Sequence, residues 1–406
     1  MNFQIGYEDL KIEGEVFLTF YTYTPVLIIG LVSSVISGIL DITRQKKYAK
    51  YASLIAVICI VILFYVSHGI DVFYDKKYYD SVISLQVLGI PEIFNEWIWG
   101  LMCLVGNKLR LDFFVFRLII VLGLFILVYN SIIKKYCCNY GWVLLVYLSY
   151  FLYVDAMQLQ NFIAMCIFMI SLKYVIDKEN GKNIIKFVIA LVIAAEIHSA
   201  YWVAFVYLIL FIKDKKTISK LLIGLEVLFI GVTYLNNNYV PIISTVMSSA
   251  SDSRLSNYSS SATVRSWIVF LMFLIVYTFC IYLIHKNNKK KYAYYKRNLD
   301  INQFETFRNS SDFVNLVLFI DIISFLIIPM NMMITHMYRL IRNIAILQYL
   351  CIFSNFKYMR GKGIQKAILL GGVIITVIVW RIFEFHYNTD YEQMVVPVLR
   401  GLYFYE

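Results

Sequence analysis

The chain has little charge for its length. Asp, Glu, Lys and Arg make up 16% of its 406 residues, whereas hydrophobic residues reach 60%. Soluble domains carry about 25% charged residues, so this chain has too few charges to cover the surface of a water-soluble globule of its size. Only five prolines occur, and proline is the residue that most often breaks a helix. The composition favours apolar helices in a membrane over a soluble enzyme or binding domain.

Cysteine patterns and histidine clusters are also absent from the sequence. Four cysteines, Cys59, Cys166, Cys280 and Cys351, lie inside apolar runs, and no CxxC spacing or His/Cys cluster occurs. The sequence therefore predicts neither a disulfide framework nor a metal site, and we expect no cofactor. The first residues are acidic and lack the basic flank and cleavage site of a signal peptide.

Most of the sequence consists of apolar runs, and each run approaches the roughly 20 residues that a membrane-spanning helix needs. The run 184–212 is too long for one span, because 29 residues at about 1.5 Å each would make a helix of about 43 Å. We expect two short helices there that meet at His198. The sequence predicts an all-α polytopic membrane protein, one membrane domain over 1–406 with about 11–12 transmembrane helices. The other runs are 16–40, 48–66, 112–130, 141–157, 161–176, 219–235, 266–285, 311–333, 337–356 and 366–383.

Lys and Arg predict how these helices are oriented, because inner loops of membrane proteins are basic. With the N-terminus outside, inner segments hold 24 of the 37 basic residues and outer segments hold 10. Both termini are then outside. The most basic inner loop is 286–310, and its charge is a topology signal, so we expect no binding of nucleic acid. Two outer segments are long: 67–111, with a short interfacial helix within it, and the large loop 236–265.

Arginine is concentrated outside, unlike lysine. Six of 12 Arg but only four of 25 Lys fall in outer segments. The guanidinium group offers a rigid fork of donors that fits phosphate and carboxylate. We favour a phosphorylated ligand on the outer face, although these arginines could instead pair with outer acids or with lipid phosphate. The candidate ligand-binding arginines are Arg254, Arg265, Arg339 and Arg342, of which Arg254, Arg339 and Arg342 are expected to converge near His198, together with Arg117 near the outer end of its helix.

His198 is the strongest single candidate for a catalytic residue. Histidine titrates near neutrality and can act as a general base, and a break in a helix at membrane depth is tolerated where it is buried in protein or lines a cavity. The alternative is a structural histidine with no role in the chemistry. Three carboxylates within spans, Asp155, Glu226 and Asp321, could be structural or could serve a proton path in a transporter.

Five short motifs lie along the chain. They are Gly69, Ile70 and Asp71 with Tyr74; Pro91 and Glu92; Gln160, Asn161, Ile163 and Ala164; His198, Ser199 and Ala200; and MYRLIRN at 337–343. They resemble the motifs of the Wzy-type polysaccharide polymerases, in particular their EpsG-like branch, which shows G-T-D followed by Tyr after the second span, then E-P, R-Q-x-I-A, F-H-x-S-A and an Arg-bearing outer turn. Pro91 and Glu92 stand in reversed order, and the largest departure is at Gln160, where the branch has Arg.

This resemblance implies a membrane glycosyltransferase that polymerises oligosaccharide repeat units linked to undecaprenyl pyrophosphate, on the outer face of the bacterial cytoplasmic membrane. It also implies membrane lipid as a partner, and a chain-length regulator and a flippase from the same pathway. A lipid-linked oligosaccharide flippase or other transporter is the alternative. The residues implied in catalysis are His198, Asp71 and Glu92, and those implied in substrate binding are the five arginines above with Gln160, Asn161 and Tyr258.

Overall fold

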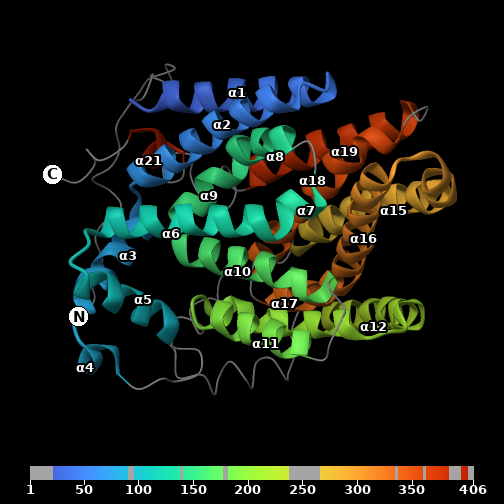
Figure 1. Cartoon of the computed structure of the whole chain (residues 1–406). Coiled ribbons are helices and arrows are strands. Elements are labelled where there is room, and N and C mark those ends of the chain that lie inside the picture. Colours follow the sequence, from blue (N-terminus) through green and yellow to red (C-terminus); the bar gives the residue numbers. More distant parts are fainter. Residues whose placement is uncertain are drawn as a thin grey trace.

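The computed structural model describes residues 22–89, 96–137, 140–176, 182–236, 266–333, 337–359, 363–383 and 395–400. Within these ranges the regular structure consists of helices, with no strand. Most helices run roughly alongside one another and form a bundle (Figure 1). The all-α prediction is confirmed.

The first half of the bundle contains two long helices, a group of short ones and three further apolar stretches. Two of the stretches include a π-helical turn, η2 and η3. The elements are α1 (Thr24–Ile42), α2 (Lys46–Val66), α3 (Ile70–Ser81), α4 (Leu85–Leu88), α5 (Trp97–Lys108), α6 (Phe113–Val128), η2 (Tyr129–Ile133), α7 (Lys134–Tyr136), α8 (Tyr140–Val146), η3 (Tyr147–Phe151), α9 (Leu152–Met157) and α10 (Leu159–Ile176).

The second half begins with the broken pair and ends with a short helix that packs on α2. Its elements are α11 (Lys182–Ala195), the 3₁₀ helix η4 (Ser199–Phe211), α12 (Lys215–Leu235), α15 (Ser266–Asn298), α16 (Ile301–Ser324), η5 (Phe325–Ile327), α17 (Ile328–Met333), α18 (Tyr338–Asn355), η7 (Phe356–Tyr358), α19 (Gly363–Ile382) and α21 (Val396–Arg400).

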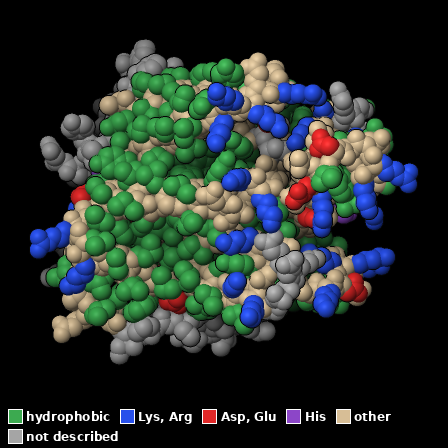
Figure 2. All heavy atoms as spheres, viewed as in Figure 1, with side chains coloured by type: hydrophobic (Ala, Val, Ile, Leu, Met, Phe, Trp, Pro, Cys, Tyr) green, Lys and Arg blue, Asp and Glu red, His purple; other side chains and the backbone are tan. Residues whose placement is uncertain are grey.

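Helices occupy all twelve span positions that the apolar runs predict. In the described part of the chain, nine helical stretches are long and apolar enough to cross a membrane on their own. The other three are α11, η4 and α18. The outward faces of the peripheral helices carry bare aliphatic side chains, such as Ile29 on α1 and Val227 on α12. They form a broad apolar belt (Figure 2). Such a surface is unfavourable in water and favourable in contact with lipid. The chain is a polytopic membrane protein.

Lys and Arg gather at one end of this belt, on the right in Figure 2. We call this end the basic face; α1 ends there and α2 begins there. We call the opposite end the site face, and it is where α1 and α6 begin and α2 ends. The helix α21 also lies at the site face, where the N–H of His68 donates to the Pro397 carbonyl at 3.1 Å.

The helices α10 and α18 form the centre of the bundle. Most residues of α10 are buried, and every residue of α18 except Arg339 is buried. Both helices begin at the site face with polar side chains. The centre of the fold thus carries buried polar groups to one end of the molecule.

The predicted broken pair at 184–212 is confirmed. The helix α11 ends at Ala195, His198 has extended backbone angles, and η4 starts at Ser199. Its 13 residues reach about 26 Å, because a 3₁₀ helix rises about 2.0 Å per residue. The 14 residues of α11 reach about 21 Å, less than the roughly 30 Å of hydrocarbon. Neither helix of the pair is therefore long enough to cross the hydrocarbon layer alone.

Two segments are more regular than the sequence suggested. The segment 286–310, predicted as a loop, is helical on both sides of a short turn, because α15 continues through Asn298 and α16 begins at Ile301. The segment 67–111 holds three helices, α3, α4 and α5, where one short interfacial helix was expected. In α5, Trp99 and Cys103 are buried in protein contacts.

Candidate functional site

Segments far apart in sequence meet at the site face. The helix α5 contacts α3 and α4, η4 contacts α11 and α18, and α3 contacts α9. The polar side chains at these helix ends form two clusters, one around His198 and one around Arg342.

His198 lies beside Glu96, which sits directly before α5. The His198 Nδ1 is 3.4 Å from Glu96 Oε1, although the alignment falls short of a hydrogen bond. The His198 side chain is 17% exposed, and its Nε2 is buried without a hydrogen-bond partner in the described part of the chain. The ring lies near Tyr201, with the two ring centres 6.4 Å apart. One nitrogen thus faces a carboxylate while the other stays unoccupied.

The carboxylate of Glu96 accepts a hydrogen bond from the backbone at the start of η4. Its Oε1 accepts the N–H of Ser199 at 3.0 Å. Burial alone raises the pKa of Glu96, but the contact with His198 and the N–H of Ser199 outweigh it, so the pKa lies below its usual value. Glu96 is therefore a carboxylate at neutral pH.

Gln160 lies between Asp75, Glu96 and Trp99. In one orientation of its amide, Nε2 donates to Asp75 Oδ1 at 3.3 Å. The opposite orientation makes two shorter bonds, from Nε2 to Glu96 Oε2 at 3.0 Å and from Trp99 Nε1 to the amide oxygen at 2.8 Å. Amide orientation is assigned from such bonding, and we adopt the second. Gln160 is thus part of the surroundings of His198.

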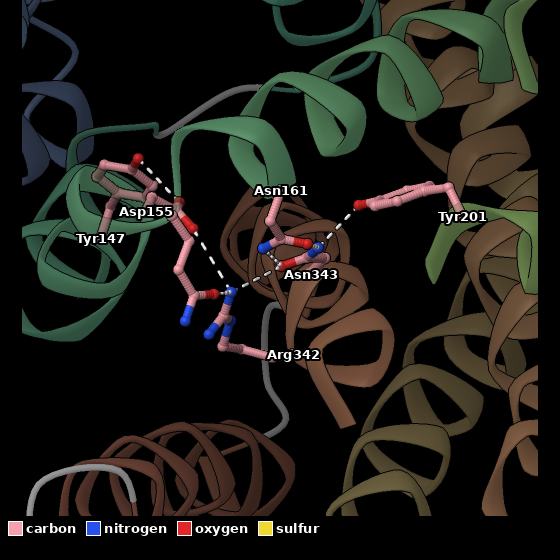
Figure 3. Close-up of polar contacts among 7 residues, drawn as sticks. Tyr147, Asp155, Asn161, Tyr201, Arg342 and Asn343 are labelled. Atoms are coloured by element: carbon pink, nitrogen blue, oxygen red, sulfur yellow. Dashed lines mark hydrogen bonds and ion pairs between the residues drawn. The ribbon is translucent and has the colours of Figure 1, made fainter. Parts of the chain in front are cut away.

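The second cluster surrounds the guanidinium group of Arg342, which is fully buried. Its Nη2 donates to Gln158 Oε1 at 3.2 Å and lies 3.9 Å from Asp155 Oδ1. The other carboxylate oxygen of Asp155 accepts the hydroxyl of Tyr147 at 3.0 Å. A buried charge is tolerated when it is paired and hydrogen-bonded. This cluster joins α18 to α9 (Figure 3).

Asn343 extends the second cluster toward His198. It exchanges amide hydrogen bonds with Asn161, at 3.0 and 3.5 Å, and its Nδ2 also donates to the Tyr201 hydroxyl at 2.7 Å. Tyr201 follows His198 by three residues. Figure 3 shows this line of contacts from Tyr147 to Tyr201 across α18. The two predicted residues Arg342 and Asn161 are therefore brought into one network.

Arg339 is the one residue of α18 that is not buried. Its Nε has no hydrogen-bond partner in the described ranges. Asp71 lies close enough that Arg339 affects it electrostatically: burial raises the pKa of Asp71, and the positive charge of Arg339 opposes that rise. The structure thus places two predicted site residues near each other at the start of α18 and the start of α3.

Arg117 is engaged by the protein itself. Its guanidinium donates to the carbonyl of Ser67 at 3.0 Å, to the Ser67 hydroxyl at 2.7 Å and to the carbonyl of Ala156. These bonds connect α6 to the ends of α2 and α9. A role for Arg117 in substrate binding stays a prediction, as it does for Arg339, Arg342, Gln160 and Asn161.

Four candidates, Glu92, Arg254, Tyr258 and Arg265, lie outside the described residues. Conversely, the sequence reasoning missed Glu96, Gln158 and Tyr201. Tyr201 could have been found, because it follows His198 at helical spacing. Glu96 gave no such signal, since it is 102 positions from its partner. Where the chain is described, no group of three or more His, Cys, Asp or Glu could hold a metal ion.

Comparison with known proteins adds one finding. A family model described as the EpsG family matches residues 49–397. No curated protein and no solved structure matches the chain.

Proposed function

The chain belongs to the EpsG family, the EpsG-like branch of the Wzy-type polysaccharide polymerases, and on that premise we propose that it joins oligosaccharide repeat units carried on undecaprenyl pyrophosphate. The match at 49–397 includes both clusters of the site face. We also propose that the site face is the outer face of the bacterial cytoplasmic membrane, with both termini outside, because the opposite end carries the lysine-rich segments (Figure 2).

The observation that carries this proposal is the unoccupied Nε2 of His198. In the transfer step, the bond between the anomeric carbon of the growing chain and its pyrophosphate oxygen breaks. The electron pair leaves with the lipid pyrophosphate, and a hydroxyl oxygen of the incoming unit bonds to the anomeric carbon. His198 accepts the proton of that hydroxyl at Nε2, as a general base within hydrogen-bond reach does.

Arg339 is suited to stabilise the negative charge of the leaving group. The departing pyrophosphate gains negative charge, and a guanidinium placed beside it stabilises that charge. Arg339 is the partly exposed residue of α18, with an unpartnered Nε. Arg342, one turn further along, holds the start of α18 through Asp155 and Gln158, so that Arg339 keeps its place. Arg254 and Arg265 are proposed as further phosphate ligands, and Tyr258 as a glycan contact.

We propose that the apolar and polar parts of the substrate contact apolar and polar surfaces of the protein, respectively. The polyprenyl tail lies against the apolar belt of Figure 2, and the glycan lies over the site face. A flippase that delivers the units and a regulator of chain length are proposed as partners in the same membrane.

The test is the variant His198→Ala in cells. A positioned base contributes about 10²–10⁴-fold to a rate, so polymer should be nearly lost while the protein still inserts in the membrane. Single repeat units on undecaprenyl pyrophosphate should accumulate in the outer leaflet. His198→Gln, which keeps one hydrogen bond, should be equally inactive if His198 is the base and milder if its role is structural.

Two other outcomes would count against the proposal. Normal polymer in His198→Ala would remove His198 from the chemistry and leave Asp71 or Glu92 as the candidate base. Units trapped in the inner leaflet would identify a flippase, since a polymerase acts after the units have crossed.

A further inference from the structure

Two short segments of the site face cap each other's helices. The helix α5 begins at Trp97, and the first N–H groups of a helix have no partner within it. Glu196 provides partners for three of them: its carboxylate accepts the N–H of Trp97 at 3.3 Å, and its carbonyl accepts those of Ile98 and Trp99 at 3.1 and 3.2 Å. The link between α11 and η4 is thereby fastened to the start of α5.

Glu96 in turn caps the start of η4, as Glu196 caps the start of α5. Its carboxylate accepts the N–H of Ser199, the first residue of η4, at 3.0 Å. Glu96 has a left-handed backbone, with φ of 51°, which costs about 1–3 kcal/mol for a residue other than glycine. Such a conformation persists where surrounding contacts stabilise it. Here the hydrogen bonds that cap α5 and η4 stabilise it.

The carboxylate of Glu96 is fixed in orientation as a result. Ser199 holds one oxygen, and Gln160 holds the other at 3.0 Å. Gln160 is itself held by the indole N–H of Trp99. The oxygen that Ser199 holds is the one that lies 3.4 Å from His198 Nδ1.

A fixed carboxylate opposite one imidazole nitrogen decides which nitrogen carries the proton. The nitrogen that faces the carboxylate is N–H, and the other is then a free acceptor. Here the facing nitrogen is Nδ1, which lies 3.4 Å from Glu96 Oε1 without a hydrogen bond in this geometry, and Nε2 is buried with no hydrogen-bond partner in the described residues.

We propose that Glu96 is a positioning residue, which holds His198 with Nδ1 protonated and Nε2 free to take the proton of the acceptor hydroxyl. This inference rests on the proposed function. It gives a role beside His198 to Glu96, whereas the carboxylates that the sequence implied in catalysis were Glu92 and Asp71. Glu196 differs from Glu96, because its contacts described above all go to the start of α5.

The test compares Glu96→Gln with Glu196→Gln in the full-length protein. Both variants keep an amide oxygen that can cap the opposite helix, so both should fold. The assay uses lipid-linked repeat units extracted from cells that carry His198→Ala. Glu96→Gln should lower kcat by about 10²–10⁴-fold with KM changed less than about twofold, because substrate binding is untouched. Glu196→Gln should keep kcat near that of the unmodified protein.

A second readout does not depend on activity. In protein labelled with ¹⁵N-histidine and placed in nanodiscs, the ring signals that disappear in His198→Gln belong to His198. They should report a proton on Nδ1, and Glu96→Gln should increase the population with the proton on Nε2.

The proposal is overturned if Glu96→Gln keeps full kcat, if it leaves the ring signals unchanged, or if Glu196→Gln is impaired to the same extent. Normal polymer in His198→Ala removes His198 from the chemistry and overturns this inference with it, whereas lipid-linked units trapped in the inner leaflet refute the proposed polymerase function.

Discussion

The buried pair of Asp155 and Arg342 offers a test of how charge is held inside this bundle. Asp155→Asn removes the negative charge and keeps the shape. The guanidinium of Arg342, fully buried, would then lose the carboxylate that faces it. Removing one member of a buried ion pair costs about 3–5 kcal/mol, because the remaining charge is left uncompensated. The double variant Asp155→Asn with Arg342→Gln removes both charges and should lose much less than the two single losses added together.

A matched control is present on the surface. Arg308 and Asp312 lie 3.9 Å apart, the same distance as Arg342 and Asp155, but their side chains are 62% and 51% exposed. Exposed pairs contribute about 0–1 kcal/mol, so Asp312→Asn should leave stability nearly unchanged. The two pairs share this distance but differ in burial, and Arg308 and Asp312 lie one turn apart on α16, whereas Arg342 and Asp155 join α18 to α9.

The assay is thermal unfolding of purified protein in nanodiscs, followed by tryptophan fluorescence. Asp155→Asn should lower the midpoint clearly, the double variant should recover part of the loss, and Asp312→Asn should match the unmodified protein. If the single and double effects simply add, Asp155 and Arg342 do not interact, and the network of Figure 3 is wrong.

Three further variants test other parts of the structure. Arg339→Lys keeps the charge but loses the fork of donors, so polymerisation should fall at least tenfold, and a rate equal to that of the unmodified protein would exclude a phosphate clamp at this position. Gly69→Ala places a Cβ on the Met157 sulfur and should cost about 1–3 kcal/mol in thermal unfolding, a loss that Met157→Ala should partly relieve if the overlap is its cause. Lys289→Cys should react with an impermeant maleimide only after cells are opened and Lys108→Cys in intact cells; the reverse pattern would invert the topology.

The architecture was largely predictable from sequence, because bilayer thickness dictates the length of an apolar run. The break at His198 followed from the same rule, since 184–212 is too long for one span. The helical form of 286–310 did not follow. Its Lys, Asn and Tyr residues lie beyond the apolar part of α15, where hydropathy gives no signal. Helix continues there because Asn288 bonds to Asn355 at the end of α18, and Lys291 bonds to the Tyr358 carbonyl in η7.

The site was predictable only in part. The motifs pointed to His198, Asn161 and Arg342, and the structure joins the last two in one network. Glu96 could not be predicted from the sequence, because its contact with His198 depends on how two distant helix ends cap each other. The length and hydropathy of each segment carry no information about such pairing.

The long helix α15 has a practical consequence for imaging. Its 33 residues measure about 50 Å, about 20 Å more than the hydrocarbon layer, and α16 returns beside it. Small membrane proteins are hard to align in electron micrographs, since little of their mass stands clear of the lipid or detergent. The α15–α16 turn at Leu299–Asp300 lies directly between two helices, so a rigid marker protein can be grafted there through continuous helix. Because the graft is at the opposite end from His198, the marked protein should remain competent for assay.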